Sequence, residues 1–305
     1  MVLSVDKDES RRLFLESKNL VLELEKSGYK NTTLDELKNQ ILKSESDILG
    51  ETKVEVKELS DLSLQTSGFI GNKIVSTGED VFVFDDKNKT VIRMNQDGKG
   101  VKMFAGKDQL SGALEIASYQ ERLFSLNDDG IYEVKTTREK IKDKDWGDSL
   151  FYLYSGNIYL LDKKENMIYR FQGSNSGFSN KSEWLAPGVS MDLSNTKDVV
   201  IDGSIWTLST TGKVTRFTNG NPTTIQIKGL PSDLSNVSSI YTNEDLKYVY
   251  LLDSISGKVV ALEKDGTFKT QYISEEIKNS QDILVSNDGK KVLLLKGSKV
   301  EYFEI

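Results

Sequence analysis

One pattern recurs along this chain, and its clearest copy is Ile205-Trp206-Thr207-Leu208-Ser209-Thr210-Thr211-Gly212-Lys213-Val214-Thr215-Arg216-Phe217. Apolar and polar side chains alternate along it as in a β-strand, and Gly212 suits a tight turn, so the stretch predicts two strands of a hairpin. The apolar run at its start recurs five more times. The variants occupy residues 81–84, 123–126, 158–161, 249–252 and 292–295.

The spacing of these six runs indicates a repeat architecture. Their first residues lie at 81, 123, 158, 205, 249 and 292, so consecutive runs are 42, 35, 47, 44 and 43 residues apart. Such a period is typical of propeller blades, each a four-stranded antiparallel sheet. In the clearest unit, strands at 198–201, 213–217 and 223–227 surround the run, and Gly-bearing turns such as 219–222 join the third strand to the fourth. We expect an all-β, six-bladed β-propeller over residues 51–305.

The last predicted blade is incomplete, because residues 300–305 supply its third strand and the chain then stops. An unpaired sheet edge is unfavourable in a propeller. Residues 52–59 form an alternating strand with no blade of their own. Placed as the outer strand of the last blade, they close the ring. Two blades are irregular: one carries a charged segment at 138–144 and the next a polar excursion at 173–181.

Residues 1–50 have a helical rather than a strand pattern and form the other predicted domain, an α-helical hairpin. Apolar residues at helical spacing predict a helix over 7–27, closed by Gly28. Thr33 and Glu36 match a capping box at the start of a second helix. The apolar stripes of the two helices either pack on each other and on the propeller, or serve as a stalk or self-association element.

Composition excludes several function classes. A net charge of -7 and a pI near 5.0 oppose binding to nucleic acid or anionic lipid. The chain has no Cys and no His, which removes thiolate nucleophiles, the Ser-His-Asp triad and imidazole-ligated zinc. Without a run of about 20 apolar residues, no membrane span is expected. The chain reads as soluble, and its compartment stays open, with the extracytoplasmic domain of a membrane-anchored bacterial protein among the possibilities.

The blade pattern resembles six-bladed propellers of the NHL, YWTD and TolB-like kind, although the YWTD motif itself is absent and residues 248–253 are the nearest approach. The helical hairpin, with residues 56–62 and 68–72 after it, resembles the C-terminal half of uncharacterised membrane-anchored proteins of candidate-phylum bacteria. The cytoplasmic half of those proteins resembles a PPM-type phosphatase, and nothing of that half is present here. The resemblance therefore implies a fold, a location and partners, and no activity.

Polar residues recur where successive inner strands begin. Propellers bind ligands at the channel mouth, where the loops before the inner strands converge. The residues at these positions are Asn72, Gly112, Asp148, Asp198, Asn236 and Asp282. Converging oxygens suit a polar ligand or a hard cation such as Ca²⁺, held by Asn72, Asp148, Asp198 and Asp282. The alternative is that they are ordinary turn residues lining a solvated channel.

Apolar and aromatic residues in the same loops are candidates for partner contacts. They are Phe69, Trp146, Trp184, Leu185, Leu230 and Pro231. We expect Trp184 and Trp206 in the core between blades. Phe69 and Trp146, the latter beside the charged residues 142–145, are the expected surface contacts for a protein or peptide partner on the channel-mouth face. The charged loops 85–89 and 162–166 lack the ligand spacing of a calcium loop and read as solvated turns.

These observations favour a non-enzymatic interaction or ligand-sensing propeller that binds a protein or small ligand at its channel mouth. The alternative is a cation-dependent, lactonase-like hydrolase using channel carboxylates. That reading needs Glu115, Asn72 and either Asp198 or Asp282 at matched positions, and Glu115 lies out of register with the others.

Overall fold

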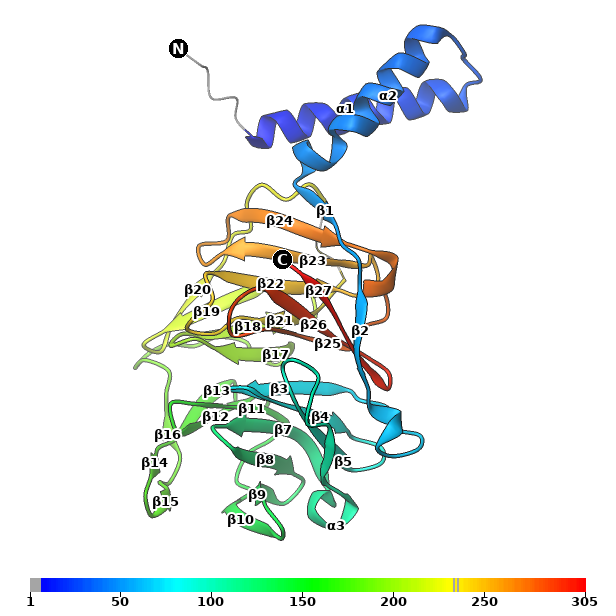
Figure 1. Cartoon of the computed structure of the whole chain (residues 1–305). Coiled ribbons are helices and arrows are strands. Elements are labelled where there is room, and N and C mark those ends of the chain that lie inside the picture. Colours follow the sequence, from blue (N-terminus) through cyan, green and yellow to red (C-terminus); the bar gives the residue numbers. More distant parts are fainter. Residues whose placement is uncertain (1–6, 233, 235) are drawn as a thin grey trace.

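The computed structural model describes residues 7–232, 234 and 236–305. Six sheets are arranged in a ring around a central channel, and a pair of helices lies outside the ring (Figure 1). The predicted six-bladed propeller with an N-terminal helical pair is confirmed. Each of the six repeated runs forms the second strand of its blade, counted from the channel.

The blades follow one another in chain order. Blade one contains β3 (Lys73–Thr77), β4 (Asp80–Asp85), β5 (Thr90–Asn95) and β6 (Lys102–Ala105). Blade two contains β7 (Ala113–Tyr119), β8 (Arg122–Asn127), β9 (Gly130–Val134) and β10 (Arg138–Asp143). Blade three contains β11 (Ser149–Tyr154), β12 (Asn157–Asp162), β13 (Met167–Phe171) and β16 (Ser182–Glu183).

The second half of the ring has the same plan. Blade four contains β17 (Thr196–Ile201), β18 (Ile205–Ser209), β19 (Val214–Thr218) and β20 (Asn221–Thr224). Blade five contains β21 (Val237–Tyr241), β22 (Tyr248–Asp253), β23 (Lys258–Glu263) and β24 (Phe268–Ile273). Blade six contains β25 (Asp282–Val285), β26 (Lys291–Lys296) and β27 (Lys299–Glu304). The first strand of each blade lines the channel and contacts the first strands of its neighbours.

The N-terminal segment closes the ring, as predicted, but it does so as two strands. β2 (Lys57–Asp61) pairs antiparallel with β27 and completes blade six. β1 (Glu51–Lys53) pairs parallel with β24 and adds a fifth strand to blade five (Figure 1). The segment thus protects two outer edges, and it ties the start of the propeller to the end of the chain.

The irregular segments also find places in the blades. The charged segment predicted at 138–144 is largely β10, the outer strand of blade two, with a bulge between Lys140 and Lys142. The polar excursion contains a small hairpin of β14 (Gly173–Ser174) and β15 (Gly177–Phe178), inserted before β16. Short helical turns occur at α3 (Lys107–Leu110), η1 (Leu62–Leu64) and η2 (Glu275–Ile277).

The helical hairpin consists of α1 (Lys7–Lys26) and α2 (Thr32–Leu49), which bury Phe14, Val21 and Ile41 between them. The predicted capping box at Thr33 is wrong. Asn31 is the N-cap of α2, because its extended backbone lets its side-chain oxygen accept from the Leu34 N–H at 2.7 Å. Within the described residues, neither helix combines the length and apolarity that a membrane span requires.

The hairpin is fastened to the outside of blade five. Arg11 donates from Nη1 to the Gly229 carbonyl at 2.6 Å, and its guanidinium lies 4.8 Å from the centre of the Phe268 ring. Gly50 ends α2 with φ 62°, and a β-carbon there would come within 2.9 Å of Phe268. Its carbonyl accepts from the Gln271 N–H at 2.9 Å. These contacts give the hairpin a defined attachment to the rim.

Candidate functional site

One level of the channel carries a ring of six residues, one from each blade, of which all but the leucine of blade three are polar. On each inner strand, one residue pairs with the fourth residue of the repeated run on the next strand. These residues are Lys73, Glu115, Leu150, Asp198, Ser239 and Asp282. Since they share one pairing register, they lie at one height, near the end of the channel at which the inner strands begin. We call this end the entry mouth.

Glu115 belongs to this ring, so its predicted displacement from the register of Asp198 and Asp282 is wrong. Bulges precede Glu115, Asp198 and Ser239 in their strands. The loop between the first and second strands also differs in length, from two residues in blade one to six in blade five. Counting residues back from each run therefore misplaces the equivalent positions.

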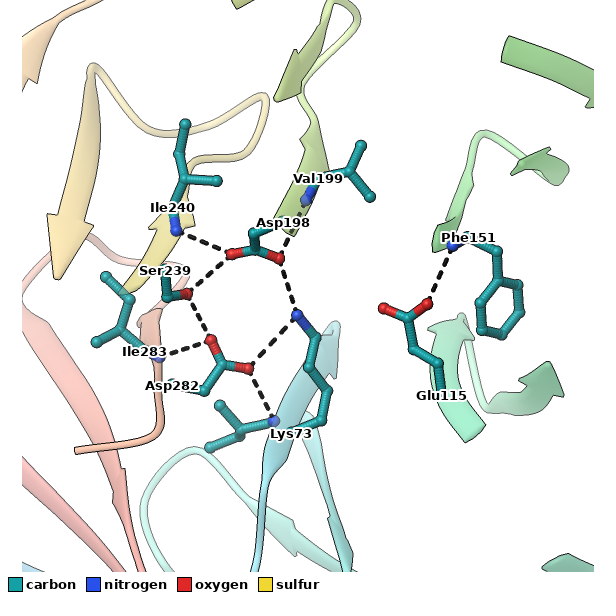
Figure 2. Close-up of polar contacts among 10 residues, drawn as sticks. Lys73, Glu115, Phe151, Asp198, Val199, Ser239, Ile240, Asp282 and Ile283 are labelled. Atoms are coloured by element: carbon teal, nitrogen blue, oxygen red, sulfur yellow. Dashed lines mark hydrogen bonds and ion pairs between the residues drawn. The ribbon is translucent and has the colours of Figure 1, made fainter. Parts of the chain in front are cut away.

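The Lys73 ammonium lies between two carboxylates of the ring. Its Nζ is 3.0 Å from Asp198 Oδ1 and 3.6 Å from Asp282 Oδ2 (Figure 2). Burial alone would lower the pKa of Lys73, but Asp198, Asp282 and Glu115 outweigh it and raise this pKa well above its usual value. Lys73 is therefore a fixed positive charge at physiological pH.

The two aspartates are held by backbone and hydroxyl donors as well. Asp198 accepts from the Val199 N–H at 3.0 Å and the Ile240 N–H at 2.9 Å. Asp282 accepts from the N–H groups of Ile283 at 3.0 Å and Ile74 at 3.1 Å. Every carboxylate oxygen of the pair has at least one partner, which leaves little capacity for further ligands (Figure 2).

Ser239 bridges the two aspartates. Its hydroxyl lies 3.0 Å from Asp198 Oδ2 and 2.5 Å from Asp282 Oδ1, with one hydrogen to share between them. Burial raises the pKa of Asp282, Lys73 opposes that change, and Asp198 adds to it. The four groups form one coupled network of an ammonium, a hydroxyl and two carboxylates.

Glu115 faces this network from blade two. Its Oε2 accepts from the Phe151 N–H at 3.1 Å, and its other oxygen points toward Lys73 (Figure 2). Burial raises the pKa of Glu115 to about 7, although Lys73 and the Phe151 N–H act in the opposite direction. Glu115 therefore exchanges its proton near neutral pH, which is the property expected of a general acid or base or of a pH-sensitive ligand contact.

A cavity of about 350 Å³ opens above the ring at the entry mouth. It is lined by the ring residues of all six blades, and by polar residues of the surrounding loops, including Asn72, Asp148, Lys163, Lys197 and Gln281. Lys163 pairs with Asp148 at 3.2 Å, and Lys197 donates to the Val237 carbonyl. Both signs of charge are present, so the cavity suits a polar ligand that donates and accepts hydrogen bonds.

The predicted Ca²⁺ ligands do not assemble into a site. Asn72, Asp148, Asp198 and Asp282 all line the entry mouth. Asn72 Oδ1, however, accepts from the Asp86 N–H at 3.0 Å, and the Asp148 side chain is 78% exposed and paired with Lys163. Asp198 and Asp282 hold the Lys73 ammonium where a cation would sit. Over the described residues, no group of three or more acidic side chains is arranged to hold a metal.

Other predicted site residues lie away from the cavity. Asn236 is exposed and is not part of the lining. Phe69 and Trp146 are buried, at 1% and 7% exposure, so their predicted surface position is wrong. The residues after them explain why. The N–H groups of Ile70 and Gly147 each donate at 2.8 Å to an aspartate, Asp85 and Asp162 respectively, which draws both loops inward.

Those two aspartates also organise the charged hairpin loops. Asp85 accepts from the Lys87 and Asn88 N–H groups, and Asp162 accepts in the same way from Lys164 and Glu165. Both side chains are fully buried. The loops are turns, as predicted, but their first residue is a structural anchor rather than a solvated charge. Trp206 is also buried, as predicted, and Trp184 packs edge-on against Tyr159.

Sequence reasoning missed Lys73 and Ser239, two of the four members of the network. A signal was present, because both residues stand opposite the fourth residue of a repeated run in the strand pairing. The pairing register could find them only once the bulges and loop lengths were known.

The chain is thus a six-bladed β-propeller with a charged network at the entry mouth of its channel. No family model matches the chain, and no curated protein is similar to it in sequence. Comparison with solved structures identifies many propellers.

Three of these propellers illustrate the range. A streptogramin B lyase is 17% identical, with a TM-score of 0.55 over 82% of this chain and 97% of its own. A gluconolactonase from Xanthomonas campestris is 10% identical, with a TM-score of 0.58 over 82% of this chain and 89% of its own. The calcium-binding protein regucalcin from Agrobacterium tumefaciens is 10% identical, with a TM-score of 0.56 over 83% of this chain and 95% of its own. At this identity the likeness establishes the fold alone.

Proposed function

We propose that this chain is a non-enzymatic propeller that binds a polar ligand, a small molecule or a peptide segment, at the entry mouth. The observation that carries the proposal is the position of Lys73, whose Nζ lies 3.0 and 3.6 Å from Asp198 and Asp282, two of the four expected cation ligands. The Lys73 ammonium balances one of the two carboxylate charges of the network, and the ligand meets the outer surface of the network together with Glu115.

The character of the cavity supports a small or extended polar ligand over a large apolar partner surface. The aromatic residues that would anchor a protein partner, Phe69 and Trp146, are buried. The lining instead offers ammonium, carboxylate, hydroxyl and amide groups within about 350 Å³. A peptide backbone or a polyol presents matching donors and acceptors.

A hydrolase remains the second candidate because of Glu115. Its pKa of about 7 is suited to proton transfer at neutral pH, and a gluconolactonase shares the fold. A lyase reaction dependent on histidine is not open to this chain, which has none. Any hydrolysis here would use Glu115 as a base without a divalent ion between Asp198 and Asp282.

Two assays on the full chain test the proposal. In the first, a triglycine peptide and glucose are titrated calorimetrically into the wild type and into Glu115→Gln, with the exposed, distant Glu139→Gln as control. Saturable binding of either probe that weakens only in Glu115→Gln supports a ligand site at the entry mouth. Absence of saturable binding of both probes contradicts it.

The second assay measures hydrolysis of glucono-1,5-lactone with and without added Ca²⁺. The proposal predicts a rate equal to the uncatalysed one in both conditions. Turnover that is lost in Glu115→Gln would replace the binding function with the hydrolase, and turnover that requires Ca²⁺ would contradict the assignment of Lys73.

A further inference from the structure

A second cavity lies at the opposite end of the channel, where the inner strands end. This exit mouth has a volume of about 340 Å³ and is formed by the ends of the inner strands and the turns that follow them. Ser118, Tyr152 and Tyr241 line both the exit mouth and the interior of the channel. The proposed function at the entry mouth uses none of these residues.

Four tyrosines from three blades surround the exit mouth. They are Tyr119, Tyr152, Tyr154 and Tyr241. The Tyr241 hydroxyl lies 3.2 Å from Ser76 Oγ, and Tyr154 donates to Glu244 Oε2 at 3.0 Å. The faces of aromatic rings attract cations, most strongly where water is partly excluded, and several rings around one cavity are a recurrent means of holding an organic ammonium group.

The charged side chains among the described residues that line the exit mouth are all negative. Glu244 and Asp245 contribute carboxylates, and among its described lining residues there is no Lys or Arg. Two lysines stand outside the lining. Lys264, in the turn after β23, pairs with Asp202 at 2.7 Å and donates to the Asn243 carbonyl at 3.2 Å. Lys247, in the same loop as Glu244, pairs with Glu263 at 3.6 Å. The entry mouth, by contrast, carries Lys73, Lys163 and Lys197.

A buried hydroxyl adds an independent sign of a ligand. Ser118 is only 9% exposed, and its Oγ has no hydrogen-bond partner among the described residues. An unpaired buried polar atom is costly. Because Ser118 lines the exit mouth, a polar group of a bound molecule would satisfy it.

We infer that the exit mouth is a binding site for a small organic ammonium ion that also carries a hydroxyl or similar polar group. The tyrosine rings and the carboxylates of Glu244 and Asp245 attract the ammonium, and Ser118 pairs with the polar group. The site is separate from the entry mouth, so either assignment stands without the other.

The test uses two probes of nearly the same shape that differ in charge: choline and its neutral isostere 3,3-dimethylbutan-1-ol. Each is titrated calorimetrically into the full chain. Choline is expected to bind saturably, and the neutral isostere about tenfold more weakly or not at all. Equal affinity for both probes, or no saturable binding of choline up to about 20 mM, overturns the inference.

Variants locate the site. Glu244→Gln removes a charge from an exposed side chain, and Tyr154→Phe removes the hydroxyl that donates to it, so neither change threatens the core. Glu244→Gln is expected to weaken choline binding at least about fivefold, whereas the distant Glu139→Gln leaves it unchanged. If Glu244→Gln and Tyr154→Phe both bind choline as the wild type does, the ligand binds elsewhere and the assignment is wrong.

Discussion

Replacing Lys73 with methionine removes the only ammonium between Asp198 and Asp282 in the described ring while keeping much of the side-chain volume. At distances of 3.0 and 3.6 Å, each ion pair is worth about 5 kcal/mol at an effective dielectric constant of about 20. Desolvation of the partly buried ammonium offsets several kcal/mol of this sum. The Lys73→Met variant should therefore lose about 3–5 kcal/mol of unfolding free energy at neutral pH.

A matched control separates this effect from the loss of any lysine at the mouth. Lys163 lines the same cavity but pairs with a single carboxylate, Asp148, whose side chain is 78% exposed. Lys163→Met should lower the free energy of unfolding by less than about 1 kcal/mol. Urea denaturation of the three proteins measures the difference. Equal midpoints for Lys73→Met and Lys163→Met would refute the view that Lys73 balances carboxylate charge in a buried network.

Three further outcomes follow from the structure. The folded-state pKa of Glu115, about 7, lies above its ordinary value of 4.5, so the folded protein favours the protonated side chain. The contribution of Glu115 to the free energy of unfolding is therefore fully present below pH 4.5 and is lost as the pH rises through 7. The free energy of unfolding of Glu115→Gln should thus exceed that of the wild type by at most about 3 kcal/mol at pH 8 and equal it near pH 4.5. Parallel curves of unfolding free energy against pH for the two proteins would contradict this. Asn31→Ala should destabilise the helical hairpin by about 1 kcal/mol, and Thr33→Ala by less, because Asn31 is the N-cap of α2. The loss of helical ellipticity on heating measures both changes. The reverse order would support the predicted capping box. Leu13 and Leu20 of α1 are 48% and 61% exposed, so they are available for self-association of the hairpin. If the hairpin self-associates, Leu20→Glu should shift the sedimentation of the full chain from dimer to monomer. A wild type that is monomeric at high concentration would contradict self-association.

Much of the fold could be predicted because the repeated run dictates it. Alternation in residues such as Ile205 and Trp206 fixes the faces of the second strands, and the spacing fixes the blade number. The closing strand could be predicted from an edge that had to be covered. Its division into β1 and β2 could not, since the parallel pairing of β1 with β24 depends on where the hairpin docks through Arg11 and Gly50.

The candidate site was predicted less well, for two physical reasons. Asp198 and Asp282 can be predicted because oxygen side chains at strand entries are easily recognised. Lys73 cannot, because a lysine in a charged sequence gives no sign of burial. Phe69 and Trp146 look exposed in loops of polar sequence, yet hydrogen bonds from the following residues to Asp85 and Asp162 draw them into the core. Such long-range contacts leave no local pattern.

Calorimetric titration of Ca²⁺ into the metal-free full chain shows most directly whether Lys73 occupies the place that a divalent ion would take at the entry mouth. If it does, no saturable binding is expected there, and the wild type and Asp198→Asn give identical titrations. One Ca²⁺ bound per chain in the wild type, and lost in Asp198→Asn, would rule out this role of Lys73.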